Sequence, residues 1–273
     1  KPTRGFGKQF SAVCKQEGDF EAFIQALSTA RANTDPMINI IVNNEYIVEQ
    51  YIEGSLHSAE VVVRDGQVEC FATTTRYRSR HNDLLEMGYS MPSGLSTTRQ
   101  AQLDTYLQEV FDAVGLQFGL YHVEILFAED GPYLVEINGR MMGGAGPQIY
   151  RTLSGLDAFE LLIRLHLDPD VEIDGKAIQQ AGTVILIGAR DGGHVSSEFT
   201  QEKLDALLRR YGITFCTLNL QARQSLQKFE GNVSVLGHVI VEGADQASSA
   251  RKGHEFLLEL DELLGVKVAK YQN

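Results

Sequence analysis

Two short segments and the turn between them decide the fold: residues 121–127 (YHVEILF) and residues 133–140 (YLVEINGR). We expect both to be strands of one hairpin, turned by Glu129-Asp130-Gly131. In an antiparallel hairpin centred on Asp130-Gly131, Glu124 of the first strand lies opposite Glu136 of the second. The hairpin therefore places the carboxylates of Glu124 and Glu136 side by side.

The opposed carboxylates indicate a cation site. Two carboxylates that face each other repel and lower stability unless a cation lies between them. Asn138 lies on the same side of its strand as Glu136 and adds a neutral oxygen. Mg²⁺ prefers such oxygen ligands, with phosphate oxygens and water completing the octahedron. Arg140, one step further along the same face, would present a positively charged fork to a phosphoryl group or an acyl phosphate.

An exposed hairpin face with ordinary surface charges is the alternative interpretation. Such a face rarely carries an acid opposite an acid, with an amide and an arginine at successive positions on one side. The sequence therefore favours a functional site made by Glu124, Glu136, Asn138 and Arg140.

Other segments give weaker signals. Residues 1–8 (KPTRGFGK) place a lysine before a glycine-rich loop that can cradle phosphates, although two glycines more often form an ordinary loop. Residues 46–54 (YIVEQYIEG) fit any strand that ends in a glycine turn. Two further groups could bind substrate, or could be a solvated loop and a turn. They are Arg76, Arg78, Arg80 and His81, and then Gly143, Gly144 and Gly146.

Composition excludes several classes of protein. The 273 residues are 43% hydrophobic and 22% charged, which is ordinary for a globular protein. A formal charge of -12 argues against broad binding to nucleic acid or anionic membranes, because both need a basic face. No run approaches the ~18 apolar residues of a membrane span. Cys14, Cys70 and Cys216 are too scattered for a metal motif or a disulfide framework, and we expect a cytoplasmic protein.

Strand-like and helix-like segments alternate along the chain, which predicts an α+β or α/β protein; we expect α+β. The expected helices are residues 19–32, 97–114, 156–167, 200–211 and 245–264. The expected strands are residues 45–52, 58–64, 67–73, 119–128, 132–137, 182–189 and 233–241. Residues 76–95 are predicted to be polar and irregular.

In this order the segments resemble the ATP-grasp superfamily, and especially its carboxylate–amine ligases of the L-amino-acid ligase type. The resemblance is strongest over residues 1–157 and includes residues 86–92 (EMGYSMP). It implies an ATP-grasp fold over residues 1–170, with antiparallel sheets and flanking helices, and a smaller C-terminal α+β lobe over residues 171–273. The family places a further N-terminal domain before these segments, so the resemblance implies a fragment of a longer enzyme.

The resemblance also assigns roles to residues. The magnesium ligands and the arginine that stabilises the transferred phosphoryl group would be Glu124, Glu136, Asn138 and Arg140. Lys1 would be the lysine that contacts phosphate, and Gly5 and Gly7 would be the glycines of the phosphate loop. Glu49 would be the acid near adenine, and Gln50-Tyr51-Ile52 would form the adenine hinge. Leu56 stands where an acid often holds the ribose, so His57 or Glu53 would replace it. Lys8 and Phe10 depart from the family's small loop residues; Lys8 would add a phosphate contact, and Phe10 would change loop closure.

By resemblance the enzyme would use ATP with Mg²⁺, or Mn²⁺. A carboxylate would attack the γ-phosphate to give an acyl phosphate, and an amine would then displace phosphate to form an amide or peptide bond. The partners would be small carboxylate and amine substrates, met by Arg76, Arg78, Gly143 and Gly144, with no nucleic acid or membrane; a homodimer is common among similar ligases. The alternatives are another ATP-grasp enzyme, such as a carboxylase or a carbamoyl-phosphate-synthase-like enzyme, and a non-catalytic ATP-binding regulatory module.

Overall fold

One antiparallel sheet forms the framework of the protein, seen in a computed structural model that describes residues 1–5, 7–79, 82–168, 170–172, 178–231 and 234–271. The sheet has eight strands in the order β5-β4-β1-β2-β3-β6-β10-β8, and a separate pair joins β7 to β9. The strands are β1 (Ser55–Arg64), β2 (Gln67–Ser79), β3 (Asn82–Met91), β4 (Gly119–Phe127), β5 (Pro132–Asn138), β6 (Ala181–Ile187), β7 (Gly193–His194), β8 (Phe215–Cys216), β9 (Ser225–Leu226) and β10 (Gly237–Gly243).

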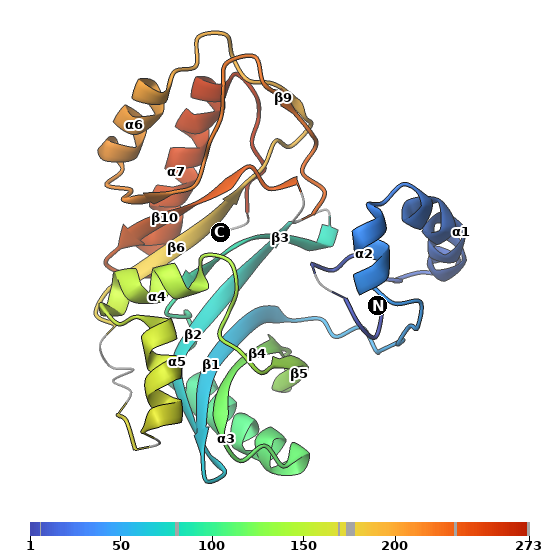
Figure 1. The fold of residues 1–273 in the computed structure, drawn as a ribbon, viewed down its shortest axis with the longest axis vertical. Helices are drawn as coiled ribbons and strands as arrows, with labels where there is room; N and C mark the ends of the chain where they lie inside the picture. Colours follow the sequence, from blue (N-terminus) through green and yellow to red (C-terminus); the bar gives the residue numbers. More distant parts are fainter. Residues whose placement is uncertain (6, 80–81, 169, 173–177, 232–233, 272–273) are drawn as a thin grey trace.

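Helices cover both faces of this sheet (Figure 1). They are α1 (Asp19–Ala32), α2 (Pro36–Ile41), α3 (Thr97–Val114), α4 (Gly146–Ser154), α5 (Ala158–Leu167), α6 (Gln201–Arg210) and α7 (Gln246–Leu264). In Figure 1, α6 and α7 lie with β6 and β10 in an upper lobe, and α3, α4 and α5 lie on the lower body. The N-terminal segment with α1 and α2 stands apart at the right. The predicted antiparallel α+β arrangement with flanking helices is confirmed.

Alternation along β1 divides the core into two parts. Ala59, Val61 and Val63 are fully buried against α3, together with Leu103, Leu107 and Phe111 of that helix. Val62, one residue out of phase, packs into the larger core formed with α4, α5 and α7. This is the period-two pattern of a strand buried on both faces.

Local turn and cap signals explain why several elements begin and end as predicted. Asp65 and Gly66 have φ angles of 47° and 79°, as the tight turn between β1 and β2 requires. Ser96 caps α3 by accepting a hydrogen bond from Arg99 N at 3.3 Å, and Gly115 ends that helix with φ of 70°. The predicted helices at residues 19–32 and 97–114 are therefore confirmed with the same bounds.

Residues 76–95 were predicted to be irregular, and this prediction is confirmed for residues 92–95 but wrong for most of the segment before them. Strand β2 continues to Ser79, and β3 runs from Asn82 to Met91. The polar side chains that made this segment look irregular are paired across the two strands. Arg76 contacts Glu86, and the Tyr77 hydroxyl lies 2.7 Å from Ser90 Oγ. Polar residues thus form a strand pair whose side chains satisfy each other. Arg80 and His81 lie outside the described residues.

The predicted strand at residues 45–52 is also wrong. The described chain has one isolated bridge there, between Pro2 and Tyr46, flanked by the bonds Thr3 N to Glu45 O at 2.8 Å and Ile47 N to Lys1 O at 2.9 Å. Beyond Ile47, no described residue continues the pairing. Helix α4 was not expected, because glycines precede it and its first residues are Gly146 and Pro147.

The predicted boundary at residue 170 falls between α5 and β6. The backbone sheet is nevertheless continuous across that point, because β3 pairs with β6 from Gly88 opposite Ile185 to Met91 opposite Gly182. The upper lobe is therefore joined to the body by a strand ladder as well as by the chain. Among the described residues, no helix is long and apolar enough to cross a membrane.

Phe111→Ala should destabilise the protein by about 3–5 kcal/mol, because the ring is fully buried between α3 and the sheet and its removal leaves a cavity. Chemical denaturation measures the free energy of unfolding. The control is Phe159→Ala on α5, where the ring is 61% exposed and a change of only about 0.5 kcal/mol is expected. Equal losses in both variants would contradict this assignment of the core.

Candidate active site

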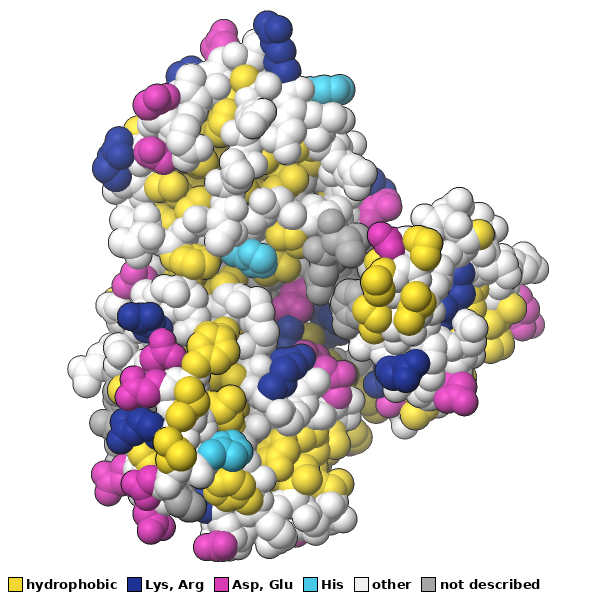
Figure 2. Space-filling model, viewed as in Figure 1, with side chains coloured by type: hydrophobic (Ala, Val, Ile, Leu, Met, Phe, Trp, Pro, Cys, Tyr) yellow, Lys and Arg dark blue, Asp and Glu magenta, His cyan; other side chains and the backbone are white. Residues whose placement is uncertain are grey.

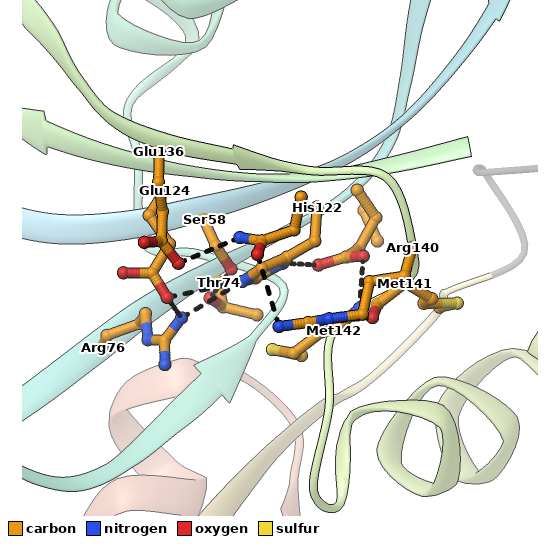
Figure 3. Close-up of polar contacts among 12 residues, drawn as sticks. Ser58, Thr74, Arg76, His122, Glu124, Glu136, Arg140, Met141 and Met142 are labelled. Atoms are coloured by element: carbon orange, nitrogen blue, oxygen red, sulfur yellow. Dashed lines mark hydrogen bonds and ion pairs between the residues drawn. The ribbon is translucent and has the colours of Figure 1, made fainter. Parts of the chain in front are cut away.

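Strand register gathers polar side chains on the sheet face that lies opposite α3. Glu136 of β5 pairs with Glu124 of β4, as predicted, and Glu124 pairs in turn with Ser58 of β1, which pairs with Thr74 of β2. A second row, one pleat along, contains Asn138, His122 and Glu60. Figure 3 labels the four residues of the first row, which lie side by side on neighbouring strands.

The end of β5 presents the predicted amide and arginine beside Glu136. Asn138 Nδ2 donates to Glu136 Oε1 at 2.9 Å, and Arg140 Nη2 lies 3.5 Å from Asn138 Oδ1. Arg140 also donates to the carbonyl of Met141 at 3.0 Å. Glu136 and Arg140 are exposed, and no cation among the described residues pairs with Glu136. The structure thus brings Glu136, Asn138 and Arg140 together at one exposed edge.

Glu124 is more enclosed and has a built-in counter-charge. Arg76 Nη1 lies 2.6 Å from Glu124 Oε1, and the same guanidinium contacts both oxygens of Glu86 at 2.7 and 2.6 Å. Burial favours a higher pKa for Glu124, but the hydrogen bond with His122 and the charge of Arg76 outweigh it and lower the pKa to about 2. Glu124 is therefore held as a carboxylate by cations of the protein.

Glu60 and His122 are the site residues that the sequence reading missed. Glu60 is fully buried and His122 is 2% exposed. His122 Nδ1 lies 2.5 Å from Glu60 Oε1, and Nε2 lies 3.5 Å from Glu124 Oε1. Burial opposes the charge on His122, yet the hydrogen bonds to Glu124 and Glu60 raise its pKa to about 9. A signal for Glu60 was present in the sequence, because it is the one acid of β1 and lies directly before the apolar residues 61–63.

The glycine-rich loop reaches toward these charges. Burial lowers the pKa of Lys8, and the nearby charges of Glu86 and Glu124 oppose that shift. Gly7, Lys8 and Phe10 have positive φ angles of 59°, 59° and 55°. Lys8 thus joins the site from the N-terminal segment.

Phe10, the bulky departure in this loop, has a specific partner. The Arg31 guanidinium of α1 lies 4.3 Å from the Phe10 ring centroid. Arg31 also donates to the carbonyls of Val42 and Asn43 and to the Tyr46 hydroxyl. The aromatic ring therefore attaches the loop to α1 and to the segment that follows α2.

The predicted nucleotide segment forms part of the same region. Lys1 Nζ pairs with Glu49 at 2.6 Å, and Lys15 Nζ lies 4.7 Å from the Tyr51 ring centroid. Arg78 Nη2 donates to the carbonyl of Gly54 at 2.9 Å, just beyond residues 50–52. Figure 2 shows a hollow between the upper lobe, the body and the N-terminal segment, with acidic and basic side chains inside it.

His57 does not join this group. Its side chain packs edge-on against Phe127 at a centroid distance of 5.6 Å, and its Nε2 contacts Ser55 Oγ at 2.9 Å. Strand alternation sets His57 on the α3 face, whereas Ser58 and Glu60 lie on the other face. The predicted ribose role of His57 has no support from this position.

Residues 1–148 match the ATP-grasp domain. The chain belongs to the ATP-grasp family. ATP-grasp enzymes in general use ATP and Mg²⁺. Carnosine synthase 1 of Gallus gallus is 29% identical over 165 residues, which cover 59% of this chain and 18% of that protein. The chain therefore spans less than a fifth of the length of this curated relative.

Two solved structures share the fold. An L-amino acid ligase from Bacillus licheniformis aligns with a TM-score of 0.63 and 17% identity, over 82% of this chain and 56% of that one. The biotin carboxylase domain of a Hydrogenobacter thermophilus 2-oxoglutarate carboxylase, solved with MgADP, aligns with a TM-score of 0.60 and 15% identity. This second alignment covers all of this chain and 57% of the biotin carboxylase chain. At these identities the likeness concerns the ATP-grasp fold alone.

Acidification should destabilise the protein through His57. Burial lowers the pKa of His57 from 6.5 to about 4, so the unfolded chain takes up a proton as the pH falls from 6.5 to 4 while the folded protein does not. The folded state therefore loses on the order of 2–3 kcal/mol across that window. Denaturation at several pH values should show this loss in the parent and a flatter profile in His57→Gln.

His166→Gln on α5 provides the control, because it removes an exposed histidine and leaves the buried His57 in place. Parallel profiles for the parent and His57→Gln would overturn the assignment of His57 to a buried, neutral state.

Proposed function

We propose that this chain is the ATP-binding part of a carboxylate–amine ligase, which forms an amide or peptide bond at the expense of ATP. The observation that carries the proposal is the register of β4 and β5, which sets Glu124 against Glu136 beside Asn138 and Arg140. The carnosine synthase relative favours ligation over the other reactions of the family.

The side chains fit a magnesium ion. Glu136 has an exposed carboxylate without a cation partner among the described residues, and it stands opposite a second carboxylate that is held ionised. Among the described residues, no group of three or more His, Cys, Asp or Glu side chains could hold a metal ion, so the two carboxylates need Asn138 and phosphate oxygens as further ligands. Glu124, Glu136 and Asn138 would therefore hold Mg²⁺, or Mn²⁺, together with phosphate oxygens. The ion would neutralise charge on the phosphates of ATP.

The N-terminal segment would bind the nucleotide. The backbone of the loop at Gly5 and Gly7 can approach phosphates closely, and the charges of Glu86 and Glu124 act on the partly buried Lys8 beside it. Lys1 and Glu49 form one pair at the predicted phosphate and adenine contacts. Residues 50–52 would supply the adenine hinge. His57 would not contact the nucleotide, because its ring packs against Phe127.

Arg140 would stabilise the transferred phosphoryl group, because it is exposed and lies next to the metal ligands. Arg76 is held between Glu86 and Glu124 and its side chain is 10% exposed, so its charge is already compensated by two acids. Arg78, the other predicted substrate arginine, donates instead to the backbone carbonyl of Gly54. Gly143 and Gly144 lie between Arg140 and α4, where backbone amides could meet a substrate carboxylate. The substrates would be small carboxylates and amines, with L-amino acids as the first to test.

Mg-ATP should raise the melting temperature of the chain, and Glu136→Ala should abolish that rise. A ligand at ~100 times its dissociation constant stabilises a protein by roughly 2.7 kcal/mol, which thermal denaturation resolves. Omitting Mg²⁺ should remove the effect in the parent as well.

Glu129→Ala is the matched control, because Glu129 is an exposed acid at the opposite end of the same hairpin. It should respond to Mg-ATP as the parent does. A parent without any Mg-ATP shift, or a full shift retained in Glu136→Ala, would count against the proposed site. Turnover of ATP that depends on bicarbonate instead of on pairs of L-amino acids would favour a carboxylase.

A further inference from the structure

Glu60 is a carboxylate buried completely in the middle of the sheet. Its chain neighbours are Ala59 and Val61, both fully buried and apolar. A buried carboxylate is strongly destabilising unless hydrogen bonds and opposite charge compensate it. Both Glu60 oxygens have such partners: Oε1 lies 2.5 Å from His122 Nδ1, and Oε2 accepts from the backbone N–H of Met142 at 2.9 Å.

These two partners belong to different parts of the site. His122 is two residues from Glu124 on β4 and contacts it through its other ring nitrogen at 3.5 Å. Met142 lies two residues after Arg140, in the loop of residues 139–145 that leads from β5 to α4. Glu60 therefore connects the strand that carries Glu124 with the loop that carries Arg140. Figure 3 shows His122 and Met142, the two residues that it joins.

The loop has few other attachments. Arg140 N donates to Asn138 O at 2.8 Å, and Gly146 N donates to Gly143 O at 3.1 Å, which are bonds within the same stretch of chain. Among the described residues, the bond from Met142 N to Glu60 is the one that joins residues 141–145 to the central strands. The buried side chains of Met141 and Met142 hold the loop against the core without a preferred direction. The hydrogen bond to Glu60, in contrast, depends on distance and angle.

We propose that Glu60 is a positioning residue: through His122 and Met142 N it sets the distance between Glu124 and Arg140, and turnover depends on that distance. The catalytic part of this inference rests on the proposed ligase function. A misplacement of about 1 Å in a phosphoryl-transfer site can lower the rate about a hundredfold with little change in substrate binding. Glu60 touches neither nucleotide nor substrate, so its removal should affect turnover more than ATP affinity.

Glu60→Gln tests the connection with little change in shape. The neutral amide can bond one partner well, but it cannot accept from both His122 and Met142 N with the strength of a carboxylate. Hydrogen–deuterium exchange followed by mass spectrometry should show the peptide of residues 139–145 exchanging at least about tenfold faster, with the β4 peptide unchanged. If Glu60→Gln does not fold, Glu60→Asp replaces it, since the shorter acid keeps the charge and cannot span both partners.

The control is Ser249→Ala, which removes a fully buried hydroxyl bonded to Thr183 in the upper lobe, away from the loop. It should leave exchange of residues 139–145 at the parent's rate. The second measurement is ADP formation from Mg-ATP with pairs of L-amino acids. In Glu60→Gln, kcat should fall at least about tenfold while the KM for ATP changes less than about threefold.

Unchanged loop exchange in Glu60→Gln would overturn the connection. Faster loop exchange with unchanged kcat would overturn the catalytic part and leave a purely structural contact. An equal fall of kcat in Ser249→Ala would show general destabilisation instead. A parent that neither binds nor turns over Mg-ATP removes the proposed function and the catalytic part with it, and loop exchange alone then decides whether Glu60 holds the loop.

Discussion

Like charges that face each other across a strand pair need compensation, and this requirement organises the centre of the molecule. The register of β4 and β5 leaves no freedom to separate Glu124 from Glu136 without shifting every side chain of the hairpin to the other face. Arg76 of β2 and His122 of β4 provide positive charge on one side of the pair. Glu86 and Glu60 in turn hold those two cations in place. The result is a polar network built on four adjacent strands.

The network explains why the sheet carries charge where it is most buried. Each charged group has at least one opposite partner within hydrogen-bonding distance, so the desolvation of one group is offset by the field of the next. Glu136 differs, because it is exposed and has no such cation among the described residues. A magnesium ion bound there would complete the alternation of charge across the sheet.

Local signals made much of the fold predictable from the sequence. The Asp130-Gly131 and Asp65-Gly66 turns, the Ser96 cap and the apolar stripe of α3 each act over a few residues, so they can be read without the tertiary structure. Strand β3 was not predicted, because its polar side chains find their partners on β2 and such pairing depends on the tertiary structure. Likewise, Glu60 could be noticed from the sequence as the one acid of β1, but its hydrogen bond to Met142, 82 residues away, could not be predicted. The Glu124, Glu136, Asn138 and Arg140 group was predictable because one hairpin holds it.

The continuity of the eight-stranded sheet restricts how the molecule can move. Bending the upper lobe away from the body would break the ladder between β3 and β6, which is costly, so these parts behave as one rigid frame. The N-terminal segment has no ladder to this frame among the described residues, and the chain enters the sheet just after Gly54. A side chain at Gly54 would collide with the Phe127 carbonyl oxygen, because the two backbones approach closely there. The chain of the N-terminal segment therefore passes into the sheet through a position where a glycine is needed for the close approach of two backbones.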